Sequence, residues 1–483
     1  MINNNRAEEL RLRIWVAIFG ASLSGGALLS EQLINRDAVL YLTVAQIFID
    51  SGFEAAISHY NWPFYSILIA AFDSITTLGL ENSARLINAT LLLVLVDAFI
   101  RVYWEVNSKV IFRWMPALII LCYSGINDYR LLIVRDWGYW AFLLLASLYL
   151  VRAYKYNKLE YYVWWQVFIL GAFLFRIEAI AILFLAPLIF LIRKEPVVRY
   201  LKACSFGFVI GLIMVFVDLT FYGESKFQQV FSYLDFYSYW VRFGGYASRV
   251  GKIAIQYYAE DYSIVFAIGG LLSVILGKVL AKVGGIYFLV FFIGLVRHKV
   301  KNSFNGFAVN VLIAVSFIIV FVFFLNSRVI AGRYTVQTVL FLLFYVTYYS
   351  EAILESIKKT SYRWLEGAFF MFFFISLAMG MHHSASNKIY LKEMGAWVKH
   401  NNTLESAYIT TNDKRLFYYS GGVEKERVTL MSVFAGNDYA LLNIDKNDKK
   451  YSRLISENKL IPTHSIDGGE KGSAILFKIN MAQ

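Results

Sequence analysis

One carboxylate, Asp37, stands just after the first long apolar run of the chain, within the stretch 35–41, which reads NRDAVLY. An acid held where a membrane helix leaves the lipid is costly unless it is solvated, paired or used. A carboxylate in such a place can remove a proton from an attacking hydroxyl group. Asp37 is therefore the first candidate for a general base.

Further charged residues stand at the expected outer ends of later apolar runs. Carboxylates and arginines alternate among them, and ionisable residues at this depth are functional candidates by default. They are Asp128, Arg130, Arg135, Asp136, Arg176, Glu178, Arg328 and Arg333. A transferase that uses a sugar linked to a lipid phosphate needs this mixture, because a carboxylate takes up the proton and arginines hold the departing phosphate.

Each candidate role has an ordinary alternative. Asp136 is a second catalytic candidate, for positioning the acceptor, and it can equally cap the helix that begins there or pair with Arg135. Arg333 is the first candidate for binding the donor phosphate, ahead of Arg328 and Arg135, although a snorkelling interfacial anchor would have the same pattern. Tyr334 can hydrogen-bond the phosphate or belong to an aromatic belt.

A wider set of residues is expected to contribute to substrate binding. For Arg176 and Glu178 there is an alternative to substrate binding, in which the two side chains form an ion pair with each other and have no further role. The set is Arg36, Tyr41, His59, Trp62, Arg176, Glu178, Arg242 and Lys252.

The composition places the chain in a membrane. Of its 483 residues, 58% are hydrophobic, against about 45–50% apolar residues in soluble domains. Apolar runs near or above roughly 18 residues predict a polytopic helical membrane protein. The net charge of +12 is assigned to short loops that set topology, so no nucleic-acid partner is expected. Cys122 and Cys204 fall inside apolar runs and are expected to be free thiols.

Lys and Arg orient about eleven expected spans, with the N-terminus in the cytoplasm and the C-terminus outside. The spans cover about 14–32, 85–103, 114–127, 137–151, 162–175, 178–192, 203–222, 283–297, 306–325, 335–350 and 365–382. A first outer loop, 33–82, holds two short amphipathic pieces, at about 37–49 and 62–79, that are expected to lie at the interface. A long outer loop, 223–262, follows the seventh span.

Residues 263–297 leave two alternatives, which are two spans or one interfacial helix followed by one span. Arg297, Lys299 and Lys301 form the stronger basic cluster of this region and are expected inside. Because the loop before this region, 223–262, is expected outside, an odd number of crossings must lead to this cluster. This parity favours an interfacial helix at 263–282 and one span at 283–297.

The composition changes after Gly380. Residues 384–483 are polar and mixed in charge, with short alternating runs at 406–410 (SAYIT) and 474–477 (AILF). They contain enough apolar residues to fold, so the sequence predicts a small α/β extracytoplasmic domain. The expected organisation is a transmembrane catalytic domain at 1–383 and a soluble C-terminal domain at 384–483.

Three local patterns carry a resemblance to a known family. They are RDAVLY at 36–41, after the first span, LIVRDW at 132–137, at the start of the fourth, and AGRY at 331–334, at the start of the tenth. In this order, and on one side of the membrane, they resemble the GT-C superfamily, in particular the branch with protein O-mannosyltransferases and the lipid A aminoarabinose transferase. The resemblance covers the order of elements over most of 12–382 and continues into the C-terminal domain.

The resemblance implies a GT-C-like fold and a glycosyltransferase that takes a monosaccharide from a polyprenyl-phosphate donor. Asp37 would then face the acceptor hydroxyl and the anomeric carbon as general base, and the displacement would invert the configuration at that carbon. The implied acceptor is a cell-envelope glycan or lipid, such as lipopolysaccharide. The implied place is the inner (plasma) membrane, with the active site and the C-terminal domain in the periplasm.

The chain departs from the family pattern at two places. The family carries an acidic pair in the first loop, where this chain reads RD at 36–37. A divalent metal cofactor therefore stays an open alternative, but the acidic pair that would support it is missing. The aminoarabinose transferase has a Lys-Pro near the second short helix, where this chain reads WP at 62–63. Residues that can replace the missing cation are His59, Arg242 and Lys252.

Other interpretations stay open. The acceptor can instead be a Ser or Thr side chain of a protein. A lipid or polysaccharide transporter would use charges along a path between broken helices, but the sequence has no pair of Gly- or Pro-broken spans in matching halves. A chain that binds a lipid-linked sugar without transferring it is a further alternative, because the first loop carries a single acid in place of the pair.

Overall fold

The computed structural model describes residues 2–29, 33–220, 236–254, 261–301, 303–328, 331–360, 362–381, 388–422, 427–431, 436–446 and 450–480. The chain divides into two compact units. The helical unit consists of 1–22, 90–129 and 135–381, and the mixed unit consists of 23–89, 130–134 and 382–483. The mixed unit therefore joins the expected first outer loop to the C-terminal residues. The boundary expected after residue 383 stays a prediction.

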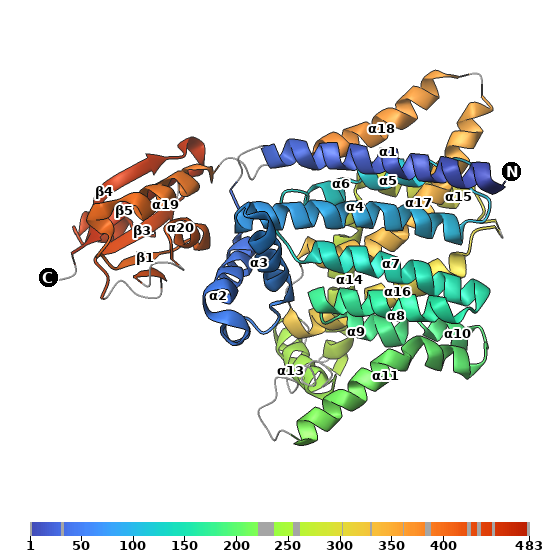
Figure 1. Ribbon diagram of the computed structural model, residues 1–483, viewed down its shortest axis with the longest axis horizontal. Coiled ribbons are helices and arrows are strands. Elements are labelled where there is room, and N and C mark those ends of the chain that lie inside the picture. The colour runs from blue at the N-terminus through green and yellow to red at the C-terminus, as the bar shows by residue number, and fades with distance from the viewer. Residues whose placement is uncertain are drawn as a thin grey trace. The chain divides into compact units, whose positions relative to one another are not determined.

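The helical unit is built from helices in its described part (Figure 1). They are α5 (Met115–Cys122), α6 (Ser124–Asn127), α7 (Asp136–Tyr156), α8 (Leu159–Phe175), α9 (Ala179–Leu185), α10 (Leu188–Ile192), α11 (Val197–Thr220), α13 (Phe236–Ala254), α14 (Ser263–Val283), α15 (Gly285–Arg297), α16 (Gly306–Ser327), α17 (Gly332–Lys358), α18 (Trp364–Met381) and the larger parts of α1 (Ile2–Leu29) and α4 (Leu80–Val106). Lipid offers no hydrogen bonds to a backbone, so apolar segments must satisfy their own, as helices do. Each expected span contains such a helix, which confirms the polytopic helical fold.

Among the described residues, six helices are long and apolar enough to cross a membrane. They are α2 (Arg36–His59), α4, α14, α16 over Gly306–Leu325, α17 and α18. α14 thus reaches spanning length, whereas parity favoured an interfacial helix at 263–282. Its lysines, Lys278 and Lys282, lie near its C-terminal end, where long side chains can reach the headgroups.

The helix of the first loop reaches that length only across a kink. Gly52 has a φ of 81° inside α2, outside the helical region. A positive φ is readily adopted by glycine, because it carries no Cβ. The part of α2 before Gly52 contains the amphipathic piece expected at 37–49. The second expected piece, 62–79, contains α3 (Phe64–Thr76).

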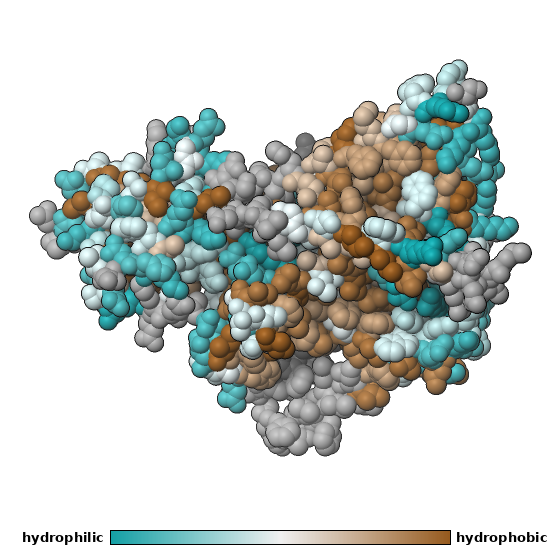
Figure 2. Space-filling model, turned by 45° about the horizontal axis from the view of Figure 1, so that its top comes forward, coloured by the Kyte–Doolittle hydropathy of each residue, from teal (hydrophilic) through white to brown (hydrophobic). Residues whose placement is uncertain are grey.

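Apolar side chains cover much of the surface of the helical unit. Figure 2 shows them as a broad brown area over the helices, while polar residues, in teal, dominate the sheet-bearing part. Exposed large apolar residues include Trp15, Val163, Trp164, Leu276, Phe292, Ile318 and Phe374. An apolar surface of this extent is a mark of contact with lipid.

The mixed unit contains one five-stranded sheet, in the order β2-β1-β3-β5-β4. β1 is parallel to β2 and β3, and β5 is antiparallel to β3 and β4. The strands are β1 (Ile409–Thr411), β2 (Val428–Leu430), β3 (Tyr439–Ile444), β4 (Leu460–Asp467) and β5 (Ser473–Ile479). β1 and β5 overlap the alternating runs, and the small α/β domain is confirmed.

Helices α19 (Tyr390–His400), α20 (Lys414–Tyr419) and α21 (Ser452–Ser456) accompany this sheet, with 3₁₀ turns at Asn402–Leu404 and Gly469–Lys471. Leu391, Met394 and Val398 repeat at helical spacing along α19, so they form one apolar face. This face packs with Leu441 and Leu476 of the sheet in a single buried core.

Candidate functional site

Four charged residues from helix ends meet in the helical unit. Asp136 begins α7, Arg176 follows α8, and Glu178 precedes α9. The Arg176 guanidinium donates to the Asp136 carboxylate and to both Glu178 oxygens, at 2.5 and 3.3 Å. Arg333, in the first turn of α17, has its Nε 4.0 Å from Oδ2 of Asp136. We call Asp136, Arg176, Glu178 and Arg333 the arginine cluster.

Close packing of α7 on α8 accounts for the meeting of Asp136 and Arg176. A Cβ atom added at Gly138 would lie 2.3 Å from the Phe175 ring, so the crossing requires glycine. Gly138 lies two positions after Asp136, and Phe175 directly precedes Arg176. The absent side chain therefore lets the two helix ends approach.

Aromatic rings flank the central guanidinium. The Cζ atom of Arg176 lies 4.6 Å from the ring centroid of Tyr334 and 5.6 Å from that of Tyr139. Such cation–π contacts stabilise a guanidinium that has lost water. The Tyr139 hydroxyl also donates a hydrogen bond to Gln337, which ties α7 to α17 beside the cluster.

A narrow cleft lies against the arginine cluster. It has one polar side and one apolar side, the latter from α16. Its lining residues are Tyr139, Trp140, Arg176, Glu178, Ile319, Val320, Phe323, Arg333, Tyr334 and Gln337. Its volume of about 10 Å³ is close to that needed for one water molecule. The polar and apolar sides suit the charge of a phosphate and an apolar chain, respectively, but the cleft must open before such a ligand can enter.

The charges around the cleft do not cancel. Arg135 interacts electrostatically with Glu178, so three arginines face the two carboxylates Asp136 and Glu178, with one net positive charge. The Asp136 side chain is 2% exposed, and its two oxygens face Arg176 and Arg333. The Asp136 carboxylate thus faces two arginines, and its expected role in positioning the acceptor stays a prediction.

Asp37 lies in the mixed unit, in the first turn of α2, and is half-buried. Asn35, at the N-cap position, anchors this end of the helix through its side chain. Its Nδ2 donates to the carbonyl oxygen of Ile133 at 3.1 Å, and its Oδ1 accepts from the Ile133 N–H at 2.8 Å. Asp37 thus belongs to the mixed unit, whereas the arginine cluster belongs to the helical unit.

Other first-loop candidates have mixed surroundings. Tyr41 is 5% exposed, and its ring packs edge-on against that of Tyr65 with centroids 5.1 Å apart. His59 ends α2 in an exposed position, and Trp62 is half-buried. Tyr41 is therefore a packing residue of the α2–α3 pair.

The remaining predicted cations gather at α13 and at the end of α16. Arg242 and Lys252 are exposed on α13, and Nε of Arg242 donates to the carbonyl oxygen of Ser238 at 3.1 Å. Arg328 ends α16, and its guanidinium stacks over the Tyr246 ring at 4.8 Å. Most of the expected outer loop 223–262 lies outside the described residues.

Sequence reasoning missed two polar residues of the cleft, Tyr139 and Gln337. Tyr139 follows Asp136 by three positions, and Gln337 follows Arg333 by four. These spacings place each pair on one face of a helix. The periodicity of α7 and α17 was therefore a signal that could have found both residues.

The mixed unit contains a second polar pocket, and of its polar residues only Arg130 is singled out as a candidate by the sequence. Arg85 is 8% exposed and donates to Glu81 at 2.7 Å. Arg130 donates to the Ser24 hydroxyl at 2.7 Å, and both arginines line this pocket together with Asn88. Arg85 stands at the start of the predicted span 85–103. A single charge in an apolar run is easily counted as part of the span and not considered as a site residue.

The acidic side chains of the described residues do not gather as a metal site requires. In the described stretches of the chain, no three His, Cys, Asp or Glu side chains form a group. Divalent cations such as Mg²⁺ and Ca²⁺ need several oxygen ligands, and the neighbour of Asp37 in the sequence is a cation, Arg36. These residues do not fit a bound divalent ion.

No protein-family model matches the sequence, and no curated protein is detectably similar to it. Among solved structures, the chain is similar to the oligosaccharyltransferase of Archaeoglobus fulgidus tethered with an acceptor peptide containing the NVT sequon. The TM-score is 0.55 at 11% identity, over 96% of this chain and 74% of that one.

Two further solved structures have lower scores. ArnT from Cupriavidus metallidurans bound to undecaprenyl phosphate has a TM-score of 0.49 at 12% identity, over 100% of this chain and 99% of that one. The archaeal oligosaccharyltransferase AglB from Archaeoglobus fulgidus, in complex with an inhibitory peptide and a dolichol-phosphate, has a TM-score of 0.47 at 10% identity, over 97% and 74%. The likeness at a TM-score of 0.55 concerns the fold alone, and it shows that this chain shares the polytopic helical fold of that oligosaccharyltransferase, in agreement with the fold expected from the sequence.

Proposed function

We propose that this chain is a membrane glycosyltransferase that moves a monosaccharide from a polyprenyl-phosphate donor to a cell-envelope glycan or lipid. The arginine cluster carries the proposal. Together with Arg135 it holds one net positive charge beside an apolar wall, which suits a phosphodiester with an isoprenoid tail. The fold shared with an oligosaccharyltransferase supports the transferase class. The proposed location is the inner membrane, with the site facing the periplasm.

The proposed reaction is an in-line displacement. The acceptor oxygen forms a bond to the anomeric carbon while the bond from that carbon to the phosphate oxygen breaks. Asp37 takes the hydroxyl proton, and the electron pair leaves with the polyprenyl phosphate. Arg333 and Arg176 stabilise the charge that the phosphate gains. Configuration at the anomeric carbon is inverted.

Replacing the proposed base tests this function. Asp37→Asn removes proton acceptance with little change in size, so the transfer rate should fall roughly 100- to 10,000-fold while donor binding is kept. Asp50→Asn is the matched control, since Asp50 is exposed on the same helix and accepts a local hydrogen bond from Gln46. Full transfer by a well-folded Asp37→Asn protein would reject Asp37 as the base.

A protein acceptor is the second candidate. It is favoured by one observation, that the oligosaccharyltransferase of similar fold holds an acceptor peptide. The two candidates separate when radiolabelled donor lipid is offered with either a lipid-linked glycan or a Ser/Thr-rich peptide. Label on the peptide alone would make this chain a protein O-glycosyltransferase.

A further inference from the structure

The segment that leads into Asp37 is built into the core of the sheet domain. Leu33 is 7% exposed and belongs to the same buried core as Leu391, Met394 and Leu441. The N–H of Ile34, next along the chain, donates to the Tyr419 hydroxyl at 3.4 Å. The start of α2 is thus held by residues of the C-terminal domain.

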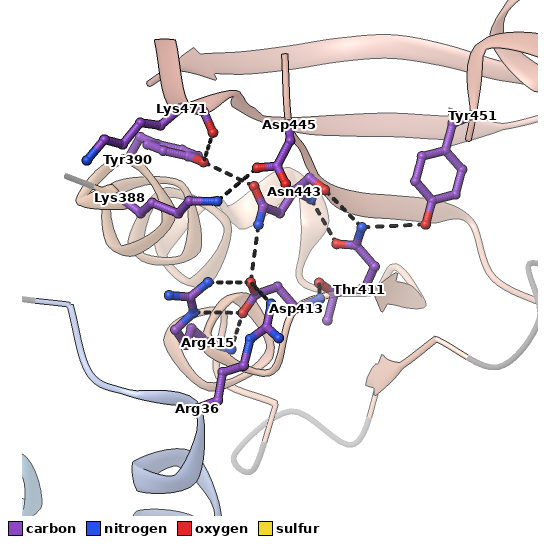
Figure 3. Close-up of polar contacts among 11 residues, drawn as sticks. Arg36, Lys388, Tyr390, Thr411, Asp413, Arg415, Asn443, Asp445, Tyr451 and Lys471 are labelled. Atoms are coloured by element: carbon purple, nitrogen blue, oxygen red, sulfur yellow. Dashed lines mark hydrogen bonds and ion pairs between the residues drawn. The ribbon is translucent and has the colours of Figure 1, made fainter. Parts of the chain in front are cut away.

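A buried carboxylate of that domain faces the start of α2. Asp413 follows β1, caps α20, and has a side chain that is 2% exposed. Its oxygens accept from Arg415, through Nε at 3.0 Å and a terminal nitrogen at 2.7 Å, and from Nδ2 of Asn443 at 3.2 Å. Figure 3 shows the Arg36 side chain reaching up to this group from α2. The separation of the Arg36 nitrogen from Oδ2 of Asp413 is 3.9 Å.

The far end of α20 contacts the far end of the first loop. Tyr419, its last residue, donates from its hydroxyl to Oε2 of Glu81 at 3.4 Å. Glu81 stands at the beginning of α4 and also accepts from Arg85. The N-cap of α20, Asp413, therefore contacts residue 36, and its last residue, Tyr419, contacts residue 34 at one end of the first loop and residue 81 at the other.

We propose that α20 is a positioning element for the transfer reaction, and that Asp413 acts on Asp37 through Arg36. The proposal rests on the proposed role of Asp37 as general base. An ion pair at 3.9 Å with an arginine that is 71% exposed contributes little to stability. It restricts the direction of Arg36, and thereby the first turn of α2. A base misplaced by about 1 Å can slow a reaction about 100-fold.

A double-mutant cycle on Arg36 and Asp413 tests this coupling. We expect Arg36→Gln and Asp413→Asn each to lower kcat, Arg36→Gln by about two- to fivefold because an exposed pair is weak, with donor and acceptor KM unchanged. The double variant should be no slower than the slower single one, because both remove the same interaction. Asp445→Asn is the matched control, as its exposed carboxylate pairs with Lys388 within the domain.

Two further measurements separate positioning from other roles. Arg36→Lys keeps the charge and should recover part of kcat, which keeps the test valid if Asp413→Asn fails to fold. Amide hydrogen exchange at residues 34–41 should be faster in Arg36→Gln, independently of activity. Additive losses in the double variant, or a raised KM in Arg36→Gln, would instead make Arg36 a direct substrate ligand and overturn the proposal.

The outcome of Asp37→Asn keeps the two proposals distinct. If Asp37→Asn abolishes transfer while Arg36→Gln and Asp413→Asn leave kcat unchanged, the positioning role is wrong and the general base stands. If Asp37→Asn retains full transfer, the base assignment fails, and the positioning role fails with it.

Discussion

At the residue scale, Arg333 is the cation of the cluster best placed to meet a ligand. Its side chain is 22% exposed, whereas that of Arg176 is 8% exposed and hydrogen-bonded to two carboxylates. The distance of 4.0 Å to Asp136 is longer than a direct hydrogen bond. Because more of its side chain is exposed, Arg333 is the arginine that a phosphate would reach first once the cleft has opened, while Arg176 adds positive charge from its buried position.

Removing this cation should weaken use of the donor. We expect Arg333→Ala to raise the donor KM roughly 10- to 100-fold, because a charge-assisted hydrogen bond contributes about 1.5–3 kcal/mol. Arg333→Lys should recover only part, since an ammonium keeps the charge but loses the planar fork. Initial rates against donor concentration in proteoliposomes measure this effect.

The matched control is Arg363→Ala, because Arg363 is an exposed arginine just before α18. Its donor KM should equal that of the unmodified protein. An Arg333→Ala protein with the same donor KM would remove Arg333 from the phosphate site.

At the scale of elements, helix ends bring the cluster together, and helix packing decides how closely they meet. The α7–α8 pair is packed through glycines on both helices. Gly138 of α7 faces the Phe175 ring, and a Cβ at Gly171 of α8 would lie 2.7 Å from the Phe142 ring. Each glycine therefore accepts an aromatic ring of the other helix.

Filling one of these gaps should separate the two helices. We expect Gly138→Ala to destabilise the protein by about 1–3 kcal/mol, as overpacking does, and to reduce transfer by moving Asp136 away from Arg176. The melting temperature in detergent and the transfer rate measure the two effects. Phe175→Leu in the same protein should restore part of both.

Gly367→Ala on α18 is the control for this change, because an added Cβ there meets nothing within 4 Å. Alanine favours a helix over glycine, so this variant should melt at the same temperature or higher. A Gly138→Ala protein that matches the control in melting and transfer would show that the α7–α8 spacing does not set the site.

Sequence periodicity predicts where helices and strands lie better than it predicts which of them pack together. Apolar length located the spans, and alternation located β1 and β5, because both signals are local. The Arg176–Asp136 pair joins residues 40 positions apart, and no local pattern encodes that choice. The same holds for Leu33, which stands beside a predicted span and packs in the core of the sheet domain. The candidate site residues are thus predicted from residue type and position, whereas their pairing depends on how the helices pack.

At the scale of the whole molecule, the first loop and the sheet domain form one compact unit. Electrostatics at Asp413 contribute to that unit. Burial alone would raise the pKa of Asp413, but the hydrogen bonds and charge of Arg415, with a smaller part from Arg36, bring it below the usual value. Since the pKa is depressed in the folded chain, the ionised carboxylate stabilises the fold above the unfolded-state pKa of about 4. This contribution is lost as the pH falls through the folded-state pKa.

Acid should therefore loosen the sheet domain through this single carboxylate. We expect amides of β1 and β3, corrected for intrinsic exchange rates, to lose protection as the pH falls below about 4. Asp413→Asn should begin with lower protection at neutral pH and show a flatter response to acid, because it has no proton to gain at that position. Asp445→Asn, whose carboxylate is exposed in its pair with Lys388, should follow the unmodified protein. Parallel loss of protection in Asp413→Asn and the unmodified protein would assign the acid response to other carboxylates.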